Sequence, residues 1–206
     1  MLTFTLIIIV AYLFGSISTA VIVCRSMGLP DPRTQGSHNP GATNVLRYGG
    51  KKAGIATLAG DIIKGVTPVL AVRLISDDPQ YLAVAAAAAF LGHMFPVFFG
   101  FRGGKGVATA FGVLLGCNWI IALSVLGIWL LTVVVSKISS LGAITAALFL
   151  PLVTWFVDDK IEYMVLSGFI TVLLLIRHHS NIHNLITGKE DKIKAGTKEH
   201  PKENET

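Results

Sequence analysis

The stretch VATAFGVLLGCNWIIALSVLGIWLLTVVV, residues 107–135, decides how the whole chain is arranged. It is 29 residues long and almost wholly apolar. A single α-helix over it would be ~43 Å long, because a helix rises ~1.5 Å per residue. The hydrocarbon core of a bilayer is ~30 Å thick. The run is therefore long for one membrane crossing and short for two, and its length does not choose between them.

The composition of the chain places this run in a membrane protein. Of 206 residues, 52% are hydrophobic and 14% are charged, and the mean hydropathy is +0.66. A soluble domain has about 25% charged residues. Further segments close to the ~20 apolar residues that a crossing needs are 3–24, 54–75, 81–100, 140–157 and 162–177. We expect the first to be a retained span, because no basic region precedes it and it has no convincing cleavage site.

Charge favours two crossings for the run 107–135. The loop after the first span is basic, with Arg25, Arg33, Arg47, Lys51 and Lys52 against one acid, and the tail from Arg177 is also basic. The loops 76–80 and 158–162 are acidic. Since positive loops stay in the cytoplasm, all basic segments share one side only if the run turns at 116–118. The sequence predicts an all-α membrane protein of about seven transmembrane helices, with the N-terminus periplasmic and the C-terminus cytoplasmic.

This topology also bears on the domain organisation and on the cysteines. Residues 1–190 are expected to form a single transmembrane domain. Residues 191–206 have almost no apolar content and are expected to be a polar, disordered cytoplasmic tail. Cys24 and Cys117 would lie on opposite membrane faces, so they cannot pair.

Three polar segments, 29–52, 101–106 and 177–190, share the predicted cytoplasmic face with the short segment 136–140. The first contains GSHNPGATN at 36–44. Glycines let a backbone approach a ligand, and hydroxyl and amide groups can surround an oxyanion. Arg33 and Arg47 flank this string and suit bidentate phosphate contacts. The pattern favours an anion site, and the alternative is a polar turn in which Ser37 or Asn39 caps a helix.

The second polar segment continues as GGKGVAT, residues 103–109. It has the form of a glycine turn that opens a helix, and the N–H groups at a helix N-terminus attract anions. Lys105 adds a positive charge to such a site. Tight turns use glycine in any case, so the spacing supports a charged turn that fixes topology equally well.

The third polar segment, RHHSNIHN at 177–184, is rich in histidine. His179 and His183 are four residues apart, as in some metal sites, but no cysteine or suitable carboxylate pattern accompanies them. We therefore expect no metal. A histidine beside a phosphate site is a candidate for proton transfer or orientation, and the alternative is an interfacial histidine of no special role.

Charged residues within the spans are unusual and are generally paired or functional. Asp61 and Lys64 are three residues apart on one helix face. They are expected to form an ion pair, with a structural role or a role in the site. His93 is expected to be a hydrogen-bonded packing group rather than a ligand.

The polar segments resemble the three cytoplasmic motifs of the bacterial acyl-phosphate:glycerol-3-phosphate acyltransferase family. The matching stretches are DPRTQGSHNPGATNVLR (31–47), GHMFPVFFGFRGGKGVAT (92–109) and RHHSNI (177–182). The likeness covers residues 1–190 and includes GSIS, DIIKG and SSLGA at 15–18, 61–65 and 139–143. It implies a small enzyme of seven spans in the bacterial inner membrane, with its active site on the cytoplasmic face. The implied reaction moves a fatty acyl group from acyl phosphate to the 1-hydroxyl of glycerol 3-phosphate, which gives lysophosphatidate for phospholipid biosynthesis.

The resemblance also implies roles for particular residues. The expected catalytic residues are Ser37, Lys105, His178 and Asn181. The expected substrate-binding residues are Arg47, Asn39, Thr43, Asn44, Gly103, Gly104, Gly106 and Ser140, while Glu190 is expected to be structural. The hydroxyl proton would leave to His178 or to the phosphate of the acyl donor, and the resemblance favours the second route. His38 and Asn184 depart from the family pattern, which has glycine and arginine at these positions.

The resemblance implies no cofactor and no nucleic-acid partner. The expected partners are the two phosphorylated substrates, membrane lipid and a soluble enzyme that makes acyl phosphate. Two other functions remain open at this point, namely a small multi-span transporter of an anionic or phosphorylated solute and a lipid-binding scaffold. A transporter would place ionisable groups along a path at the midplane and show repeat symmetry, whereas the polar groups of this chain gather on one face.

Overall fold

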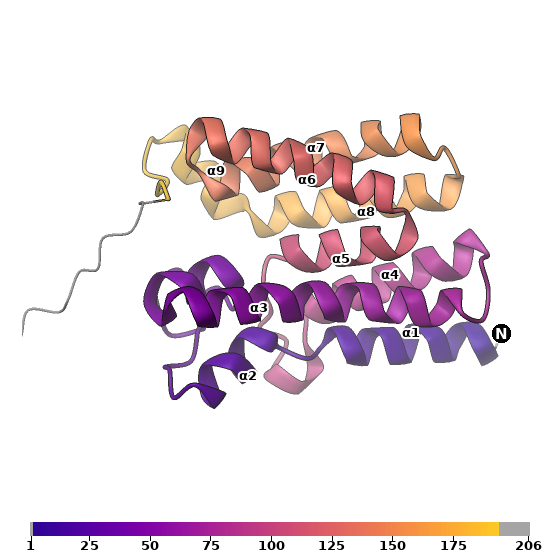
Figure 1. Cartoon of the computed structure of the whole chain (residues 1–206), viewed down its shortest axis with the longest axis horizontal. Helices are drawn as coiled ribbons and strands as arrows, with labels where there is room; N and C mark the ends of the chain where they lie inside the picture. The colour runs from indigo at the N-terminus through magenta and orange to yellow at the C-terminus, as the bar shows by residue number, and fades with distance from the viewer. Residues whose placement is uncertain (1, 194–206) are drawn as a thin grey trace, which may run out of the picture.

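The computed structural model describes residues 2–193. Its regular elements are all helices, and most of them lie lengthwise in one bundle (Figure 1). They are α1 (Leu2–Gly15), α2 (Thr19–Ser26), α3 (Ala42–Arg73), α4 (Pro79–Met94), the 3₁₀ turn η1 (Val97–Phe99), α5 (Val107–Cys117), α6 (Trp119–Ser136), α7 (Ser139–Val157), α8 (Ile161–Arg177) and α9 (His179–Ile186). Helices α1 to α4 form one group, α6 to α8 form another, and α5 lies between them (Figure 1).

The helices agree with a protein that crosses a membrane several times. Within the described residues, five segments are long and apolar enough to cross, and α8 with α9 makes a sixth candidate that is bent by 61°. The all-helical, multi-pass prediction is confirmed. The number seven and the orientation of the termini stay predictions, because α5 is apolar but only 11 residues long.

The run 107–135 breaks where the sequence predicted a turn. Asn118 ends α5 and caps α6, and its Oδ1 accepts hydrogen bonds from the N–H groups of Ile120 and Ile121. The two helices run in opposite directions (Figure 1). Glycine lets the short α5 approach α3 closely, because a side chain on Gly112 would meet the backbone of Ile62. The predicted return of the chain at 116–118 is thus confirmed.

Two predicted spans differ from the observed helices. The first, expected as one helix over 3–24, is interrupted at residues 16–18 between α1 and α2. The interruption frees the carbonyl oxygen of Ile17, which accepts a hydrogen bond from Lys64 Nζ at 2.8 Å. The span expected over 54–75 begins earlier, at Ala42, and contains a kink at Gly50, whose φ is 80°. Only the part after this kink has the composition of a membrane span, so hydropathy does not predict the polar first turns of α3.

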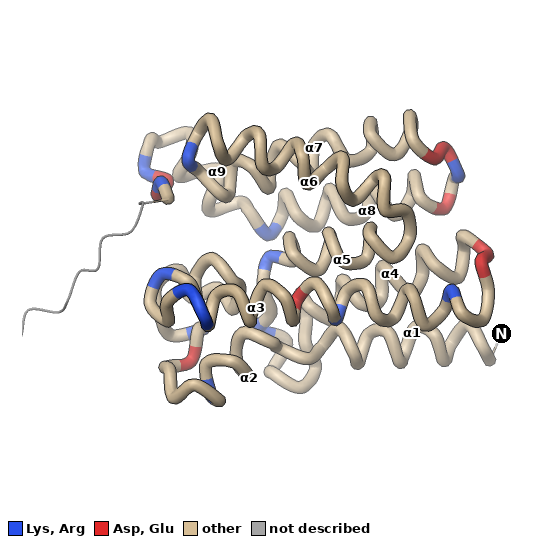
Figure 2. The backbone as a smooth tube through the Cα atoms, viewed as in Figure 1, with Lys and Arg blue, Asp and Glu red and all other residues tan. Residues whose placement is uncertain are grey.

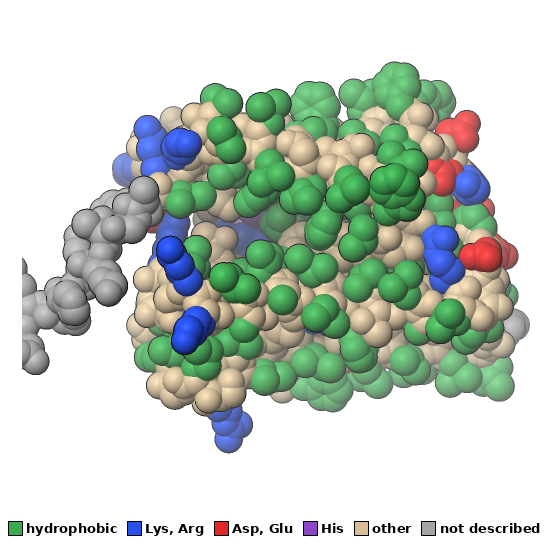
Figure 3. All heavy atoms as spheres, viewed as in Figure 1, with side chains coloured by type: hydrophobic (Ala, Val, Ile, Leu, Met, Phe, Trp, Pro, Cys, Tyr) green, Lys and Arg blue, Asp and Glu red, His purple; other side chains and the backbone are tan. Residues whose placement is uncertain are grey.

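Charged residues gather at the two ends of the bundle (Figure 2). The loops 76–80 and 158–162 are acidic at one end, and the three polar segments of the sequence meet at the other, which is basic. Hydrophobic side chains cover much of the surface between the ends (Figure 3). Cys24 and Cys117 are free and buried. Asp191 and Ile193 contact the rest of the chain, and residues 194–206 of the expected tail lie outside the described residues.

Candidate active site

A cavity of about 460 Å³ opens at the basic end of the bundle. In Figure 3 the surface is hollowed between the two groups of helices, and basic side chains are visible inside the hollow. Loops and the ends of α3, α7 and α9 supply most of its polar lining. Helices α5, α6 and α7 supply an apolar lining that includes Phe111, Leu114, Leu126, Trp129 and Leu150. The cavity therefore joins a polar, cationic mouth to an apolar interior.

The first loop of this mouth is shaped by Asn44, a buried residue in the first turn of α3. Its Oδ1 accepts a hydrogen bond from the N–H of Ser37 at 3.0 Å. Its Nδ2 lies 3.0 Å from the carbonyl oxygens of Pro32, Gln35 and Asn39. Because both ends of the amide are engaged inside the loop, Asn44 shapes the loop that carries Ser37 and Asn39. Neither of these two caps α3, which begins after Gly41 without a side-chain cap.

Two other contacts hold the same loop. The guanidinium of Arg33 pairs with Asp31 at 2.6 Å, which lowers the pKa of that carboxyl, and it donates to the carbonyl oxygen of Phe99 at 3.1 Å. His38 has a φ of 57°, in the left-handed region. This conformation costs a non-glycine residue ~1–2 kcal/mol. The loop thus keeps a glycine-like backbone at the position where the sequence departs from the family pattern.

The glycine turn at 103–106 fits between α4 and α8. A side chain on Gly103 would meet the backbone carbonyl oxygens of His93 and Met94. Arg177 donates to the carbonyl oxygen of Gly103 at 2.6 Å and to that of Gly104 at 3.0 Å. Gly106, with a φ of 89°, is the N-cap residue directly before α5. The turn is therefore fixed by its carbonyl groups, and within residues 2–193 the N–H groups of Gly104 and Lys105 donate to no other residue.

Lys105 extends from this turn into a network that links the second and third segments. Its Nζ donates to Asn181 Oδ1 at 2.5 Å, and Asn181 Nδ2 donates to Glu190 Oε1 at 2.6 Å. The hydroxyl of Ser140 donates to the same carboxylate oxygen. Burial lowers the pKa of Lys105, and the carboxylate of Glu190 opposes that effect. The network holds a partly desolvated ammonium group at the mouth of the cavity.

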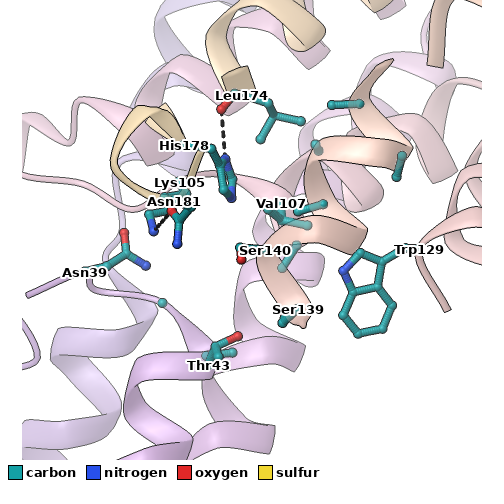
Figure 4. Close-up of a pocket in the computed structure, with 18 of the residues that line it drawn as sticks. Asn39, Thr43, Lys105, Val107, Trp129, Ser139, Ser140, Leu174, His178 and Asn181 are labelled. Carbon is teal, nitrogen blue, oxygen red and sulfur yellow. Dashed lines mark hydrogen bonds between the residues drawn. The ribbon is translucent and has the colours of Figure 1, made fainter. Parts of the chain in front are cut away.

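His178 is buried at the end of α8 and points into the cavity beside Lys105 and Asn181 (Figure 4). Its Nδ1 lies 2.8 Å from the carbonyl oxygen of Leu174. A carbonyl oxygen only accepts, so Nδ1 carries the proton of this hydrogen bond. In the neutral ring, Nε2 then has a free lone pair and can accept a hydrogen bond from a ligand.

Arg47 closes the mouth on the side of α3. Its guanidinium pairs with Asp191 at 3.1 Å, and both side chains are largely exposed. The N–H of Ile193 donates to the carbonyl oxygen of Lys137 at 2.7 Å. Residues 189–191 and 193 thus run along the edge of the cavity and line it.

The structure brings most of the expected site residues together. The cavity is lined by Ser37, Asn39, Thr43, Asn44, Arg47, Lys105, Gly106, Ser140, His178 and Asn181. Gly103 lines an adjoining hollow of about 290 Å³ with Ser37, Asn39 and Lys105, and Gly104 lies in the turn between them. Asn184 also lines the main cavity. His179 and His183 do not, and the described residues hold no group of three His, Cys, Asp or Glu side chains that could bind a metal ion.

Three residues near the site had no such role in the sequence analysis. In the sequence, Arg177 marks the start of the basic tail, and its place directly before His178 in the third motif is the signal for its role in the site. Ser139 and Asp191 line the cavity beside Ser140 and Glu190. Ser139 belongs to the SSLGA stretch, which is a usable signal, whereas the place of Asp191 depends on how the chain after α9 meets α3.

The chain matches the family model described as glycerol-3-phosphate acyltransferase over residues 5–188. It belongs to the glycerol-3-phosphate acyltransferase family. A glycerol-3-phosphate acyltransferase of Thioalkalivibrio sulfidiphilus (strain HL-EbGR7) is 50% identical over 198 residues, which cover 96% of this chain and 98% of that protein. One from Yersinia pestis (strain Pestoides F) is 53% identical over 186 residues, which cover 90% of this chain and 85% of that protein.

Two solved structures of PlsY (YgiH), an integral membrane glycerol 3-phosphate acyltransferase, have the same fold. The glycerol 3-phosphate form is 38% identical, with a TM-score of 0.88 over 93% of this chain and 96% of that one. The lysophosphatidic acid form is 37% identical, with a TM-score of 0.86 and the same coverage. As a member of the glycerol-3-phosphate acyltransferase family, the chain is a multi-pass membrane enzyme.

Proposed function

We propose that this acyltransferase uses acyl phosphate as its donor and acylates the 1-hydroxyl of glycerol 3-phosphate, giving 1-acyl-glycerol 3-phosphate. The cavity is the observation that carries the proposal, because it joins a cationic mouth to an apolar interior. Phosphate groups suit the mouth, and a fatty acyl chain suits the interior between α5, α6 and α7. The solved glycerol 3-phosphate and lysophosphatidic acid forms of PlsY support this reading.

The donor is argued from its chemistry. Acyl phosphate is a mixed anhydride that is already activated, so the reaction needs no covalent enzyme intermediate. The hydroxyl oxygen of glycerol 3-phosphate forms a bond to the carbonyl carbon, and the bond between that carbon and the phosphate oxygen breaks. The leaving phosphate takes the hydroxyl proton, so the products are 1-acyl-glycerol 3-phosphate and inorganic phosphate.

The protein is then left with two tasks, placement and charge stabilisation. The hydroxyl oxygen has to lie ~3–3.5 Å from the carbonyl carbon. Donors fixed in a partly desolvated site can stabilise the charge that develops there. We assign charge stabilisation to Lys105, Arg47 and the N–H groups of the glycine turn. His178 Nε2 accepts a hydrogen bond from the hydroxyl group and orients it.

The other residues at the mouth support these roles. Ser37, Asn39 and Thr43 offer neutral polar groups to a phosphate, and Asn44 holds the loop that carries them. Asn181 holds Lys105 directly, and the carboxylate of Glu190, to which Ser140 also donates, holds Asn181. No cofactor takes part in the proposed reaction.

The donor can be tested with the purified full-length protein. Glycerol 3-phosphate is supplied with acyl phosphate, with acyl-CoA or with acyl carrier protein, and lysophosphatidate and inorganic phosphate are measured. We expect the two products in equal amounts with acyl phosphate. Lysophosphatidate formed from acyl-CoA or acyl carrier protein but not from acyl phosphate would contradict the proposed donor.

We also propose seven crossings in the bacterial inner membrane, with the N-terminus periplasmic and the active site cytoplasmic. The separation of basic and acidic loops supports this orientation. It also places the mouth of the cavity where a soluble enzyme that makes acyl phosphate can deliver it.

A labelling experiment tests the orientation. Single cysteines replace Lys189 at the basic end and Asp159 at the acidic end, both exposed, in a chain without Cys24 and Cys117. In intact cells with a permeabilised outer membrane, we expect an impermeant maleimide to label Asp159→Cys alone. Labelling of Lys189→Cys alone would reverse the proposed orientation.

A further inference from the structure

A buried cluster of charged and polar side chains lies directly behind the glycine turn. Asp61, Lys64 and His93 are 2%, 4% and 5% exposed. Lys64 Nζ lies 2.9 Å from Asp61 Oδ1, and Thr19 donates to the same oxygen. Lys64 Nζ also donates to the carbonyl oxygen of Ile17 in the break between α1 and α2. The cluster therefore joins α3 to the interrupted first span.

His93 connects this cluster to the turn. Its Nδ1 lies 3.5 Å from Asp61 Oδ1 and packs against it, but within the described residues this nitrogen makes no hydrogen bond. The opposite edge of the ring faces the turn, because a side chain on Gly104 would meet His93 Nε2 first. The backbone carbonyl oxygen of His93 packs in the same way against Gly103. One residue thus contacts both glycines that precede Lys105.

Arg177 completes the arrangement from the other side. It donates to the carbonyl oxygens of Gly103 and Gly104, so the turn is held between this guanidinium and the imidazole of His93. Lys105 follows Gly104 directly, and its position depends on the turn. A displacement of ~1 Å at a reacting group can cost ~10²-fold in rate.

The cost of the cluster indicates that it has a function. Ionisable groups inside a membrane are expensive and are generally retained for pairing or function. An ion pair between Asp61 and Lys64 satisfies both charges without an imidazole. The ion pair alone therefore does not account for His93, which lies between the carboxylate and the turn. A ring held at a fixed place beside the turn would account for it.

We infer that His93, packed against the buried pair of Asp61 and Lys64, is a positioning residue that holds the Gly103–Gly104 turn and so places Lys105 in the site. The inference rests on the proposed role of this turn in binding the phosphate substrates. Asp61 and His93 also line the cavity. Because the Nδ1 of His93 faces Asp61 and its Nε2 faces Gly104, His93 acts through the turn.

The first test replaces His93 with alanine and with glutamine in the full-length protein. His93→Ala should lower kcat/KM for glycerol 3-phosphate about 10–100-fold, because the turn loses its support. His93→Gln should recover most of this loss, since its amide reaches the place of Nε2. The KM for glycerol 3-phosphate should rise in His93→Ala, and the melting temperature of His93→Gln should stay within about 5 °C of the original. Ser167→Ala, a buried polar change in α8, is the matched control and should keep its activity.

The second test removes the ion pair against which His93 packs, without leaving a lone buried charge. The double variant Asp61→Asn with Lys64→Met should lose activity as His93→Ala does. Adding His93→Ala to it should cause little further loss, because the residues act as one unit. Additive losses would overturn the proposed coupling.

The outcomes separate this inference from the proposed function. If the unchanged protein makes no lysophosphatidate from acyl phosphate, the proposed function fails. The inference fails if the unchanged protein is active and the His93→Ala variant, although folded, keeps a kcat/KM within about threefold of it. Such a factor is worth less than 1 kcal/mol. It also fails if lost activity in all variants follows their melting temperatures and returns when the assay is cooled.

Discussion

Replacing Lys105 with alanine should lower kcat/KM for glycerol 3-phosphate by about 10²–10³-fold, the loss typical of removing one fixed donor to a developing negative charge. The ammonium group is partly desolvated and is held by Asn181 at 2.5 Å. Its charge is therefore worth more than that of an exposed lysine. The measurement is initial rate against substrate concentration, with purified protein and acyl phosphate as donor.

A matched control for this variant is Lys52→Ala. Lys52 is exposed on α3 at the same end of the bundle, so its removal changes the net charge equally without touching the cavity. We expect this control to keep its kcat/KM, and we expect both variants to insert in the membrane and purify like the original. Near-normal turnover by folded Lys105→Ala would overturn the assignment of the site.

The helices could be predicted where a local signal is strong. Asn118 lies within an apolar run, and the charges of the loops around this run predict that the chain turns back across the membrane there. The observed break between α5 and α6 occurs at Asn118. The interruption at 16–18 could not be predicted in this way. It depends on a carbonyl group of Ile17 that Lys64 satisfies from another helix.

The site residues also divide into features that the sequence predicts and features that depend on the folded structure. The three polar segments could be assigned to one face from charge alone, and the structure places them around one cavity. Which atoms face a ligand is a tertiary property. Asn44 looks like a free donor in the sequence, yet its amide is used inside the loop, and Arg177 looks like a tail residue, yet it holds the glycine turn.

The cationic groups lie at the basic end of the bundle (Figure 2), where a membrane enzyme can bind a phosphate group at the surface of the bilayer. An acyl chain partitions into the hydrocarbon region, whereas a phosphate group stays at its surface. The cavity extends from the basic end into the apolar interior between α5, α6 and α7. A single site can then hold a lipid-like donor and a water-soluble acceptor without moving either across the membrane.

His178→Ala should lower kcat by about 10²-fold or more, as expected for a group that orients a nucleophile or transfers its proton. His183 is exposed on α9 and lines neither hollow, so His183→Ala is the matched control and should keep its rate. His178→Gln separates the two routes for the proton, because glutamine can accept a hydrogen bond but cannot act as a base. If the leaving phosphate takes the proton, His178→Gln should recover to within about tenfold of the original rate, and a rate as low as that of His178→Ala would assign the base to His178. If the His178→Ala variant is folded and its kcat is unchanged, His178 has no role in the reaction.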